Sequence, residues 1–476
     1  MTANMGSEQP SVFKAVQWLA IAKLGVQLLS WVGTYYTTTL LLPSDYGLST
    51  MATAFTQFAN LFASMGIGVT IIQRQSVPEE EIHNLFTLSL LLGSICAVAS
   101  YFLAYAGGWF FHRQDIIHLT QFTAVIFISN ALSIVPYNIL NRDMRFRERA
   151  MVDVNSTILS MACQVFMARA GFGAWSLLGG VGIRAFLRML FSFYYSRYIP
   201  ILQLKWEIVK KDLAFSVPLT FNSLLFELTE GIVPMLIGRF YSATQLGYYS
   251  LAYTLSEVPN QKVVQIIREI LLPLLSRKEA SERIGGLFTS LKFCTLFITP
   301  AYMAGFYFGT PLINALFPNK WTAMAPIFAG LCLLQIFKVM SSIFSIFNTA
   351  NGEPARTIRQ SVALVLLLPL SVLLFRSLPL YYFPYIWTFI HASVFSIWVY
   401  TLMRRSGPFL GRLLLINIQV LGACSGLMAF DFFGHRFLPH ADNQFMMIAR
   451  AVFFLLCYLA FIYSFHWPFV VAFRKK

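Results

Sequence analysis

Arg184 and Arg188 are the residues whose type and spacing most strongly indicate a functional role. They lie four positions apart in an apolar segment, so they share one face of a helix about midway along it. A cation at the centre of a membrane helix costs about 2.5–3.5 kcal/mol unless it faces water or a partner. We expect these two arginines, with Lys338 and Lys23 from other apolar segments, to line a water-filled cationic cavity. The alternative is that buried acids neutralise these cations and that the pairs hold helices together.

Five further cations lie in apolar segments of the sequence. Lys262 and Lys292 are about two helical turns inside their segments, so the pattern is equally consistent with cavity lining and with snorkelling to the membrane interface. Arg169, Arg268 and Arg450 lie near expected helix ends, and we expect their side chains to snorkel.

Three acids lie in segments of the same kind. Glu227 and Glu230 are three positions apart, share a helix face and lie between two prolines, which lack an amide donor and loosen a helix. Glu257 lies two residues before Pro259. Carboxylates on a bent helix can bind a proton or Na⁺, so coupling to an H⁺ or Na⁺ gradient is one hypothesis. The other is that these acids are counter-charges of the cavity cations.

Motifs for covalent, metal or nucleotide chemistry are absent from the sequence. The six cysteines lie in apolar stretches without CxxC spacing, and the seven histidines show no HExxH or other ligand spacing. There is no GxxxxGK[ST] signature. A membrane transferase or polymerase would normally need a large outer loop with clustered acids, and the longest outer connections expected here, 107–115 and 431–445, contain few acids. We therefore expect no catalytic residues, no metal, no cofactor and no enzyme activity.

The composition indicates that membrane-spanning helices position these residues. The chain has 476 residues, of which 57% are hydrophobic and 12% charged, against about 25% charged in soluble domains. A helix needs about 20 apolar residues to cross a bilayer, so the sequence predicts an all-α polytopic membrane protein with about 14 spans. We place the spans at 12–41, 46–72, 84–106, 116–140, 151–169, 173–196, 212–238, 245–275, 285–309, 322–349, 358–375, 380–403, 410–430 and 446–467.

Lys and Arg residues concentrate in alternate connections between these spans. Cytoplasmic loops carry such an excess, so both termini are predicted to be cytoplasmic. The net charge of +15 therefore reflects membrane topology, and we expect no nucleic-acid partner. The basic segment from Arg142 to Arg149 is explained by this topology and by attraction to anionic headgroups. Capture of an anionic substrate at the inner leaflet is its alternative role.

An internal repeat relates the two halves of the chain. The loop 45–48 contains Gly47 and matches the loop 245–248, which contains Gly247, at an offset of 200. Two more short matches follow in the same order, at 85–87 with 287–289 and at 140–142 with 347–349, at offsets of 202 and 207. We infer two six-helix bundles in the same orientation around a central cavity, a parallel repeat of the kind found in transporters. The expected organisation is a cytoplasmic tail at 1–11, bundles at 12–198 and 212–403, a cytoplasmic linker at 199–211, two appended helices within 410–467 and a basic cytoplasmic tail at 468–476.

Several short motifs resemble those of the polysaccharide transporter (Wzx-type) flippases. They are Leu42-Pro43-Ser44-Asp45-Tyr46-Gly47-Leu48, Ile71-Ile72-Gln73, Leu140-Asn141-Arg142-Asp143-Met144-Arg145-Phe146-Arg147, Gly171-Phe172-Gly173-Ala174-Trp175-Ser176-Leu177, and Leu246-Gly247-Tyr248-Tyr249-Ser250-Leu251-Ala252-Tyr253 followed by Val258-Pro259. The resemblance covers the first ten spans well and the last four poorly. The family belongs to the multidrug/oligosaccharidyl-lipid/polysaccharide exporter superfamily, and the resemblance implies a two-lobed bundle with alternating access.

The resemblance also implies a substrate and a location. We expect a flippase that moves an undecaprenyl-diphosphate-linked oligosaccharide across the bacterial inner membrane for exopolysaccharide, capsule or O-antigen synthesis. Guanidinium and ammonium groups in a wet cleft can replace the hydration shell of the diphosphate. Membrane lipids, and the polymerase and chain-length regulator of the same pathway, are the other expected partners. A multidrug or cation antiporter of the same superfamily is the alternative, for which an acidic or apolar lumen is expected.

Overall fold

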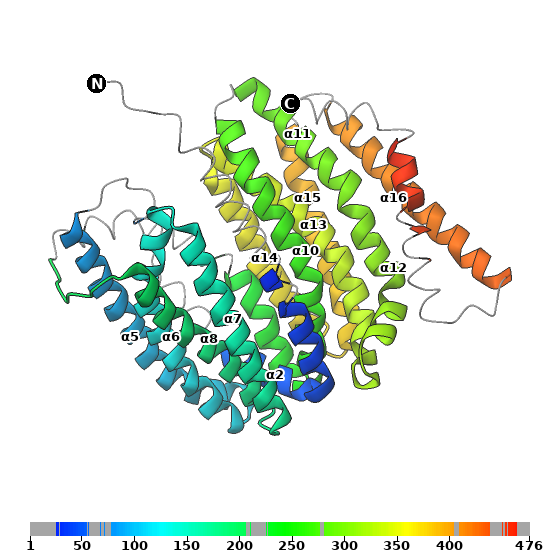
Figure 1. Ribbon diagram of the computed structural model, residues 1–476. Coiled ribbons are helices and arrows are strands. Elements are labelled where there is room, and N and C mark those ends of the chain that lie inside the picture. The colour runs from blue at the N-terminus through cyan, green and yellow to red at the C-terminus, as the bar shows by residue number, and fades with distance from the viewer. Residues whose placement is uncertain are drawn as a thin grey trace, which may run out of the picture. The chain divides into compact units, whose positions relative to one another are not determined.

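The computed structural model describes residues 25–27, 29–54, 56, 67, 71, 78–205, 210, 225, 227–276, 280–403, 409–437, 450, 453–454 and 456–463. Within these ranges every regular element is a helix (Figure 1), which confirms the all-α prediction. Seven helices of the described part are long and apolar enough to span a membrane. The chain forms two compact units, Met1–Gly247 and Tyr248–Lys476. The boundary lies beyond the predicted linker 199–211, inside a helix whose first residues pack in the first unit.

The first unit is built from antiparallel helices that follow one another along the chain. Helices α5 and α6 pack together, α8 packs on both α6 and α7, and α2 packs on α6 and α8 (Figure 1). The bounds are α2 Pro43–Ala54, α5 Glu79–Phe111, α6 Asp115–Arg142, α7 Phe146–Arg169 and α8 Ala174–Ser196, and residues 227–240 are also helical.

The second unit is organised around one largely buried helix, α13. Helices α11, α12, α14 and α15 each contact α13, and α16 contacts α11, α12 and α15. The bounds are α10 Ala243–Ser276, α11 Ala280–Phe297, α12 Thr299–Leu316, η1 Asn319–Met324, α13 Ala325–Ala350, α14 Pro354–Leu374, η2 Leu380–Tyr382, α15 Phe383–Met403 and α16 Phe409–Phe437. The predicted single span 285–309 lies within Glu282–Leu316, which is long and apolar enough to cross a membrane as one span. A one-residue break at Ile298 divides it into α11 and α12, because Pro300 in the first turn of α12 has no amide to continue the ladder.

Local sequence explains where the first-unit helices begin. Pro78 precedes α5, and three acids fill its first turn, where they complement the helix dipole. At α2, the Asp45 carboxylate accepts a hydrogen bond from the amide of Leu42 at 2.8 Å. A Cβ built on Gly173, which has φ +53°, would lie 2.9 Å from the other Asp45 oxygen. Two motifs of the flippase resemblance, far apart in the sequence, therefore meet where α8 begins beside α2.

The repeated glycines Gly47 and Gly247 lie at one helix crossing within the first unit. A Cβ on Gly47 would overlap the backbone carbonyl of Ala243, and a Cβ on Gly247 would overlap that of Pro43. The start of α2 and the first turn of α10 therefore touch backbone to backbone. Residues without side chains permit such close approach between membrane helices. The contact is reciprocal at the offset of 200 seen in the sequence.

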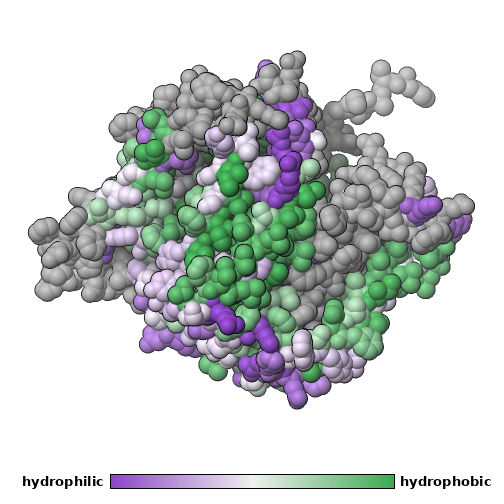
Figure 2. Space-filling view, turned by 180° about the vertical axis from the view of Figure 1, so that it is seen from behind, coloured by the Kyte–Doolittle hydropathy of each residue, from purple (hydrophilic) through white to green (hydrophobic). Residues whose placement is uncertain are grey.

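Large apolar side chains are exposed on the outside of the helices. Examples are Trp109, 76% exposed, together with Phe166, Phe389 and Ile418. Hydrophobic residues cover much of the described surface in Figure 2. Apolar area of this extent is typical of helices that face lipid.

Candidate functional site

A buried polar network lies between α10 and α13 of the second unit, centred on Glu257 and Lys338. The Lys338 ammonium lies 3.2 Å from Glu257 Oε2 and donates a hydrogen bond to the Tyr253 hydroxyl at 2.7 Å. The side chains of Lys338 and Glu257 are only 10% and 13% exposed. Of the predicted site residues, these two are brought together as an ion pair.

Amide side chains complete the environment of the Glu257 carboxylate. Gln335 donates to Oε2 at 2.6 Å and Asn260 lies 3.4 Å from Oε1. Asn260 also donates to the Gln335 carbonyl at 2.8 Å, so the two amides orient each other. The carboxylate thus has three hydrogen-bond donors around it, from Lys338, Gln335 and Asn260. The network therefore stabilises a buried charge pair and joins α10 to α13, and a role in lining a cavity stays a prediction.

A second cluster lies in the first unit around the aromatic ring of Tyr137 on α6. The Arg188 guanidinium from α8 lies 3.9 Å from the ring centroid, and that of Arg149 from α7 lies 5.4 Å from it. Arg149 donates to the Tyr137 hydroxyl at 3.1 Å, and that hydroxyl donates to Asp153 at 2.9 Å. Two guanidinium groups therefore converge on one ring, with one carboxylate behind it.

Arg188 is incompletely satisfied in this cluster. Its Nε is buried and has no hydrogen-bond partner among the described residues. A buried, unpaired donor of a charged group is costly, because its lost hydration is not replaced. A cluster with two cations, one acid and an open donor has the chemistry of an anion site.

The other predicted site residues lie apart from these two clusters. Arg184, one turn from Arg188 on α8, is exposed at the surface of the first unit, and Lys262 is exposed on α10. Lys292 on α11 and the acids Glu227 and Glu230 are half-buried. Lys23 lies outside the described residues. The predicted cationic cavity would be lined by residues of both units, so it also stays a prediction.

Sequence reasoning did not single out Asp153 and Tyr137 as site residues, and it considered Arg149 only within the basic segment from Arg142 to Arg149, whose alternative role is capture of an anionic substrate. In the structure α7 begins at Phe146 and carries Arg149 in its first turn. The signal that could have found the site is the spacing of Arg149 and Asp153, which are four positions apart and share a helix face. Gln335 was missed because an uncharged amide gives no signal in a charge search.

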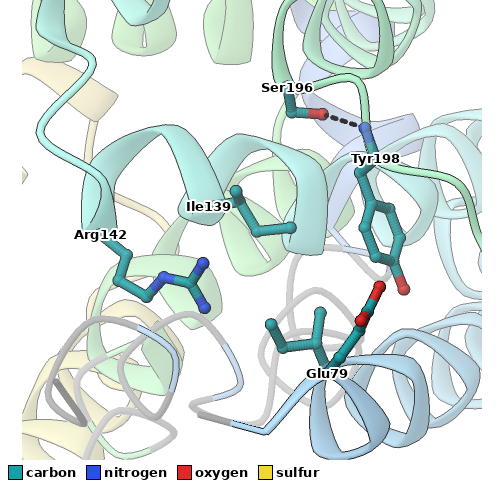
Figure 3. A pocket seen from close by; sticks show the side chains of 6 residues that line it. Glu79, Ile139, Arg142, Ser196 and Tyr198 are labelled. Carbon is teal, nitrogen blue, oxygen red and sulfur yellow. Dashed lines mark hydrogen bonds between the residues drawn. The ribbon is translucent and has the colours of Figure 1, made fainter. Parts of the chain in front are cut away.

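A small pocket opens at one end of the first unit (Figure 3). Its volume is about 300 Å³, and its walls are the N-terminus of α5, the end of α6, and the end of α8 with the segment that follows it. The lining residues are Glu79, Ile82, Ile139, Arg142, Ser196 and Tyr198. In the described part of the chain no group of three His, Cys, Asp or Glu side chains is placed to hold a metal ion.

Comparison with known proteins places this sequence in a family. Residues 38–326 match the family model described as polysaccharide biosynthesis protein. The succinoglycan biosynthesis transport protein ExoT of Rhizobium meliloti (strain 1021) is 23% identical over 347 residues, which cover 72% of this chain and 70% of ExoT. The lipopolysaccharide biosynthesis protein WzxC of Escherichia coli (strain K12) is 23% identical over 341 residues, 70% of this chain and 68% of WzxC.

Solved structures of membrane transporters share the fold. The inward closed conformation of the lipid II flippase MurJ superposes with a TM-score of 0.78 at 16% identity, over 95% of this chain and 99% of that chain. An inward-facing multidrug resistance MATE family transporter of the MOP superfamily gives a TM-score of 0.60 at 15% identity, over 86% and 99% of the two chains. The family model covers more than half of the sequence, so the chain belongs to the polysaccharide biosynthesis protein family, and its fold is that of polytopic membrane transporters.

Proposed function

We propose that this protein is a flippase that moves an undecaprenyl-diphosphate-linked oligosaccharide across the bacterial inner membrane, with both termini in the cytoplasm. The relatives support a role in polysaccharide export, since ExoT is named as a succinoglycan transport protein and WzxC as a lipopolysaccharide biosynthesis protein. The fold is that of a lipid II flippase, whose name gives the same class of cargo, a lipid-linked saccharide.

The observation that carries the proposal is the arginine cluster at Tyr137. A lipid-linked diphosphate cannot enter hydrocarbon unless other groups replace its water, and paired guanidinium groups do this with bidentate hydrogen bonds. Arg188 has a buried Nε with no acceptor within the described structure, and Arg149 lies on the same ring. In the proposed mechanism the diphosphate supplies the acceptor that Arg188 lacks. Arg184 and Lys338 are proposed to line the path of the same group.

Alternating access of the two bundles is the proposed transport cycle, with a proton or Na⁺ as the coupling ion. Glu227 and Glu230 are half-buried acids three positions apart, so they are the preferred coupling residues. Glu257 already binds Lys338, so it is proposed to couple only if that pair opens during the cycle. The polymerase and chain-length regulator of the same pathway are the proposed protein partners.

Drug export is the second candidate, and the MATE likeness favours it at the level of fold. The two candidates differ in the sign of charge that the substrate site must present. A cationic drug would be repelled by the two guanidinium groups at Tyr137, so the local charge favours an anionic substrate.

Polymer export in the native host lacking this gene tests the proposal. Wild-type protein should restore export, and Arg188→Ala at matched membrane levels should reduce it about 10- to 100-fold, the effect of one lost charge-assisted hydrogen bond. Arg188→Lys should restore export in part, since it keeps the charge and loses the planar fork. The control is Arg113→Ala, which removes an equal charge from an exposed pair with Asp115. Failure of the wild type to restore export would reject the flippase. Equal export by Arg188→Ala and the control would reject the site.

A further inference from the structure

The pocket at the end of the first unit has walls of opposite charge. Glu79 lies at the start of α5 and Arg142 at the end of α6, with the isoleucines Ile82 and Ile139 as apolar lining (Figure 3). The Glu79 side chain is 89% exposed, so this wall is in contact with water. Arg142 uses its Nε to bind Asp143 at 2.9 Å, and a guanidinium has four further N–H donors. The pocket thus offers a carboxylate acceptor on one wall and guanidinium donors on another.

The Tyr198 hydroxyl is held in a fixed position beside Glu79. Figure 3 shows the Glu79 carboxylate next to this hydroxyl. The hydroxyl is hydrogen-bonded to His83 Nδ1 at 2.9 Å, and the Tyr198 ring stacks on His83 and on Phe193. Burial, with Glu79 nearby, raises the pKa of Tyr198 to about 12, so the phenol stays neutral and can donate as well as accept at physiological pH.

The backbone around the pocket fixes its polar groups as well. Ser196 accepts a hydrogen bond from the amide of Tyr198 at 3.2 Å. Two residues after Arg142, Met144 has φ +54°, a left-handed conformation that is strained for a residue other than glycine. The amide of Arg145 closes this turn on the carbonyl of Leu140 at 2.9 Å. The end of α6 that carries Arg142 is therefore set by a tight, strained turn.

These walls disfavour an anionic ligand and suit a polyhydroxyl. Glu79 would repel a diphosphate, and the charge of Arg142 is already paired with Asp143. A sugar ring presents hydroxyls that both donate and accept, and apolar C–H faces that match the isoleucines and the tyrosine ring. The volume of 300 Å³ is at the lower end of the range for small-molecule sites, about 300–1,000 Å³, and suits one sugar unit better than a whole oligosaccharide.

We propose that this pocket is a saccharide subsite that binds one neutral sugar unit of the lipid-linked substrate, at the end of the first unit where the predicted cytoplasmic loops lie. The inference rests on the proposed function, because it assigns the sugar part of that substrate a place separate from the diphosphate. A zwitterionic lipid headgroup is the competing occupant, since it also carries one charge of each sign.

Direct binding to the purified full-length protein tests the subsite. The probes are the methyl glycosides of glucose, galactose and N-acetylglucosamine, with glycerophosphoethanolamine as the headgroup probe, and saturation-transfer NMR reports binding. At least one glycoside should bind the wild type, and Glu79→Gln and Arg142→Gln should each weaken that binding at least about tenfold. Glu81→Gln is the matched control, because it removes the same charge from the same helical turn and does not line the pocket. Glu79→Gln is isosteric at an exposed position, so its effect does not come from misfolding.

Three results would overturn the subsite: no glycoside binding to the wild type, equal binding by Glu79→Gln and Glu81→Gln, or pocket-dependent binding of glycerophosphoethanolamine alone. Polymer export separates this inference from the proposed function. Export by the wild type without pocket-dependent glycoside binding would leave the flippase and reject the subsite. Glycoside binding without export by the wild type would reject the flippase as proposed and leave the pocket as a saccharide site.

Discussion

Removing the charge on Lys338 or Glu257 one at a time should destabilise the second unit more than removing both. Lys338→Met leaves the Glu257 carboxylate with only its amide donors, and Glu257→Gln leaves the ammonium with the Tyr253 hydroxyl. Both side chains are close to fully buried, with 10% and 13% exposure. Breaking one partner of a buried ion pair typically costs about 3–5 kcal/mol, whereas replacing both by neutral groups is often close to neutral.

The double variant should therefore recover much of the loss. We expect the coupling energy, the difference between the double variant and the sum of the single variants, to be at least about 2 kcal/mol. Reversible unfolding in mixed micelles, followed by tryptophan fluorescence, measures the free energies. Lys262→Met is the control, since Lys262 is exposed on the same helix as Glu257 and should change the free energy of unfolding by less than about 0.5 kcal/mol.

Strictly additive losses, or a single Lys338→Met that is as stable as the control, would refute the pair as a stabilising element. Polymer export by the same variants then separates the two roles considered for Lys338. If the pair only joins α10 to α13, the stable double variant should export polymer at the wild-type level. If Lys338 contacts the diphosphate, the double variant should be stable and inactive.

Three further predictions concern the first unit. Gly47→Ala should lower the free energy of unfolding by about 1–3 kcal/mol, because the added Cβ overlaps the carbonyl of Ala243. Adding Gly247→Ala should lower it by less than a second such amount, because one separation of the helices relieves both overlaps. Additive losses in the same unfolding assay would contradict this. Asn84→Ala removes the acceptor of the Lys205 amide, so hydrogen exchange of the segment 197–205 should accelerate about tenfold, and unchanged exchange by mass spectrometry would contradict the contact. Tyr137→Phe keeps the ring under Arg188 and should retain polymer export, whereas Tyr137→Leu should reduce it; equal export by the two variants would show that the ring plays no part.

The helices were predictable from the sequence because hydropathy reports depth in the membrane. Spans such as 84–106 and 116–140 fall inside α5 and α6. Hydropathy does not report which way a side chain faces or what it meets. Arg184 and Arg188 have the same sequence signal, yet one is exposed and the other packs on an aromatic ring contributed by another helix.

Contacts between side chains that are far apart in the sequence could not be predicted for a similar reason. Glu257 and Lys338 belong to different helices, and no local pattern relates two positions so far apart. Charge bias alone did not single out Arg149, because a basic residue in the first turn of a helix gives the same signal as one in the adjoining loop. The saccharide pocket is made by three chain segments that meet only in the folded unit.

The crossing of α2 and α10 has a consequence for how such a chain arises. The carbonyl of Ala243 leaves no room for a side chain at Gly47, and the carbonyl of Pro43 leaves none at Gly247. The same steric requirement for glycine therefore applies at both positions. In an ancestor made of two identical copies, one glycine meeting its own image across a two-fold axis would satisfy both positions at once. If the two halves of this chain arose in that way, a substitution at either glycine would carry the cost of separating the two helices. Glycine is therefore expected to persist at both positions after the surrounding sequence has diverged.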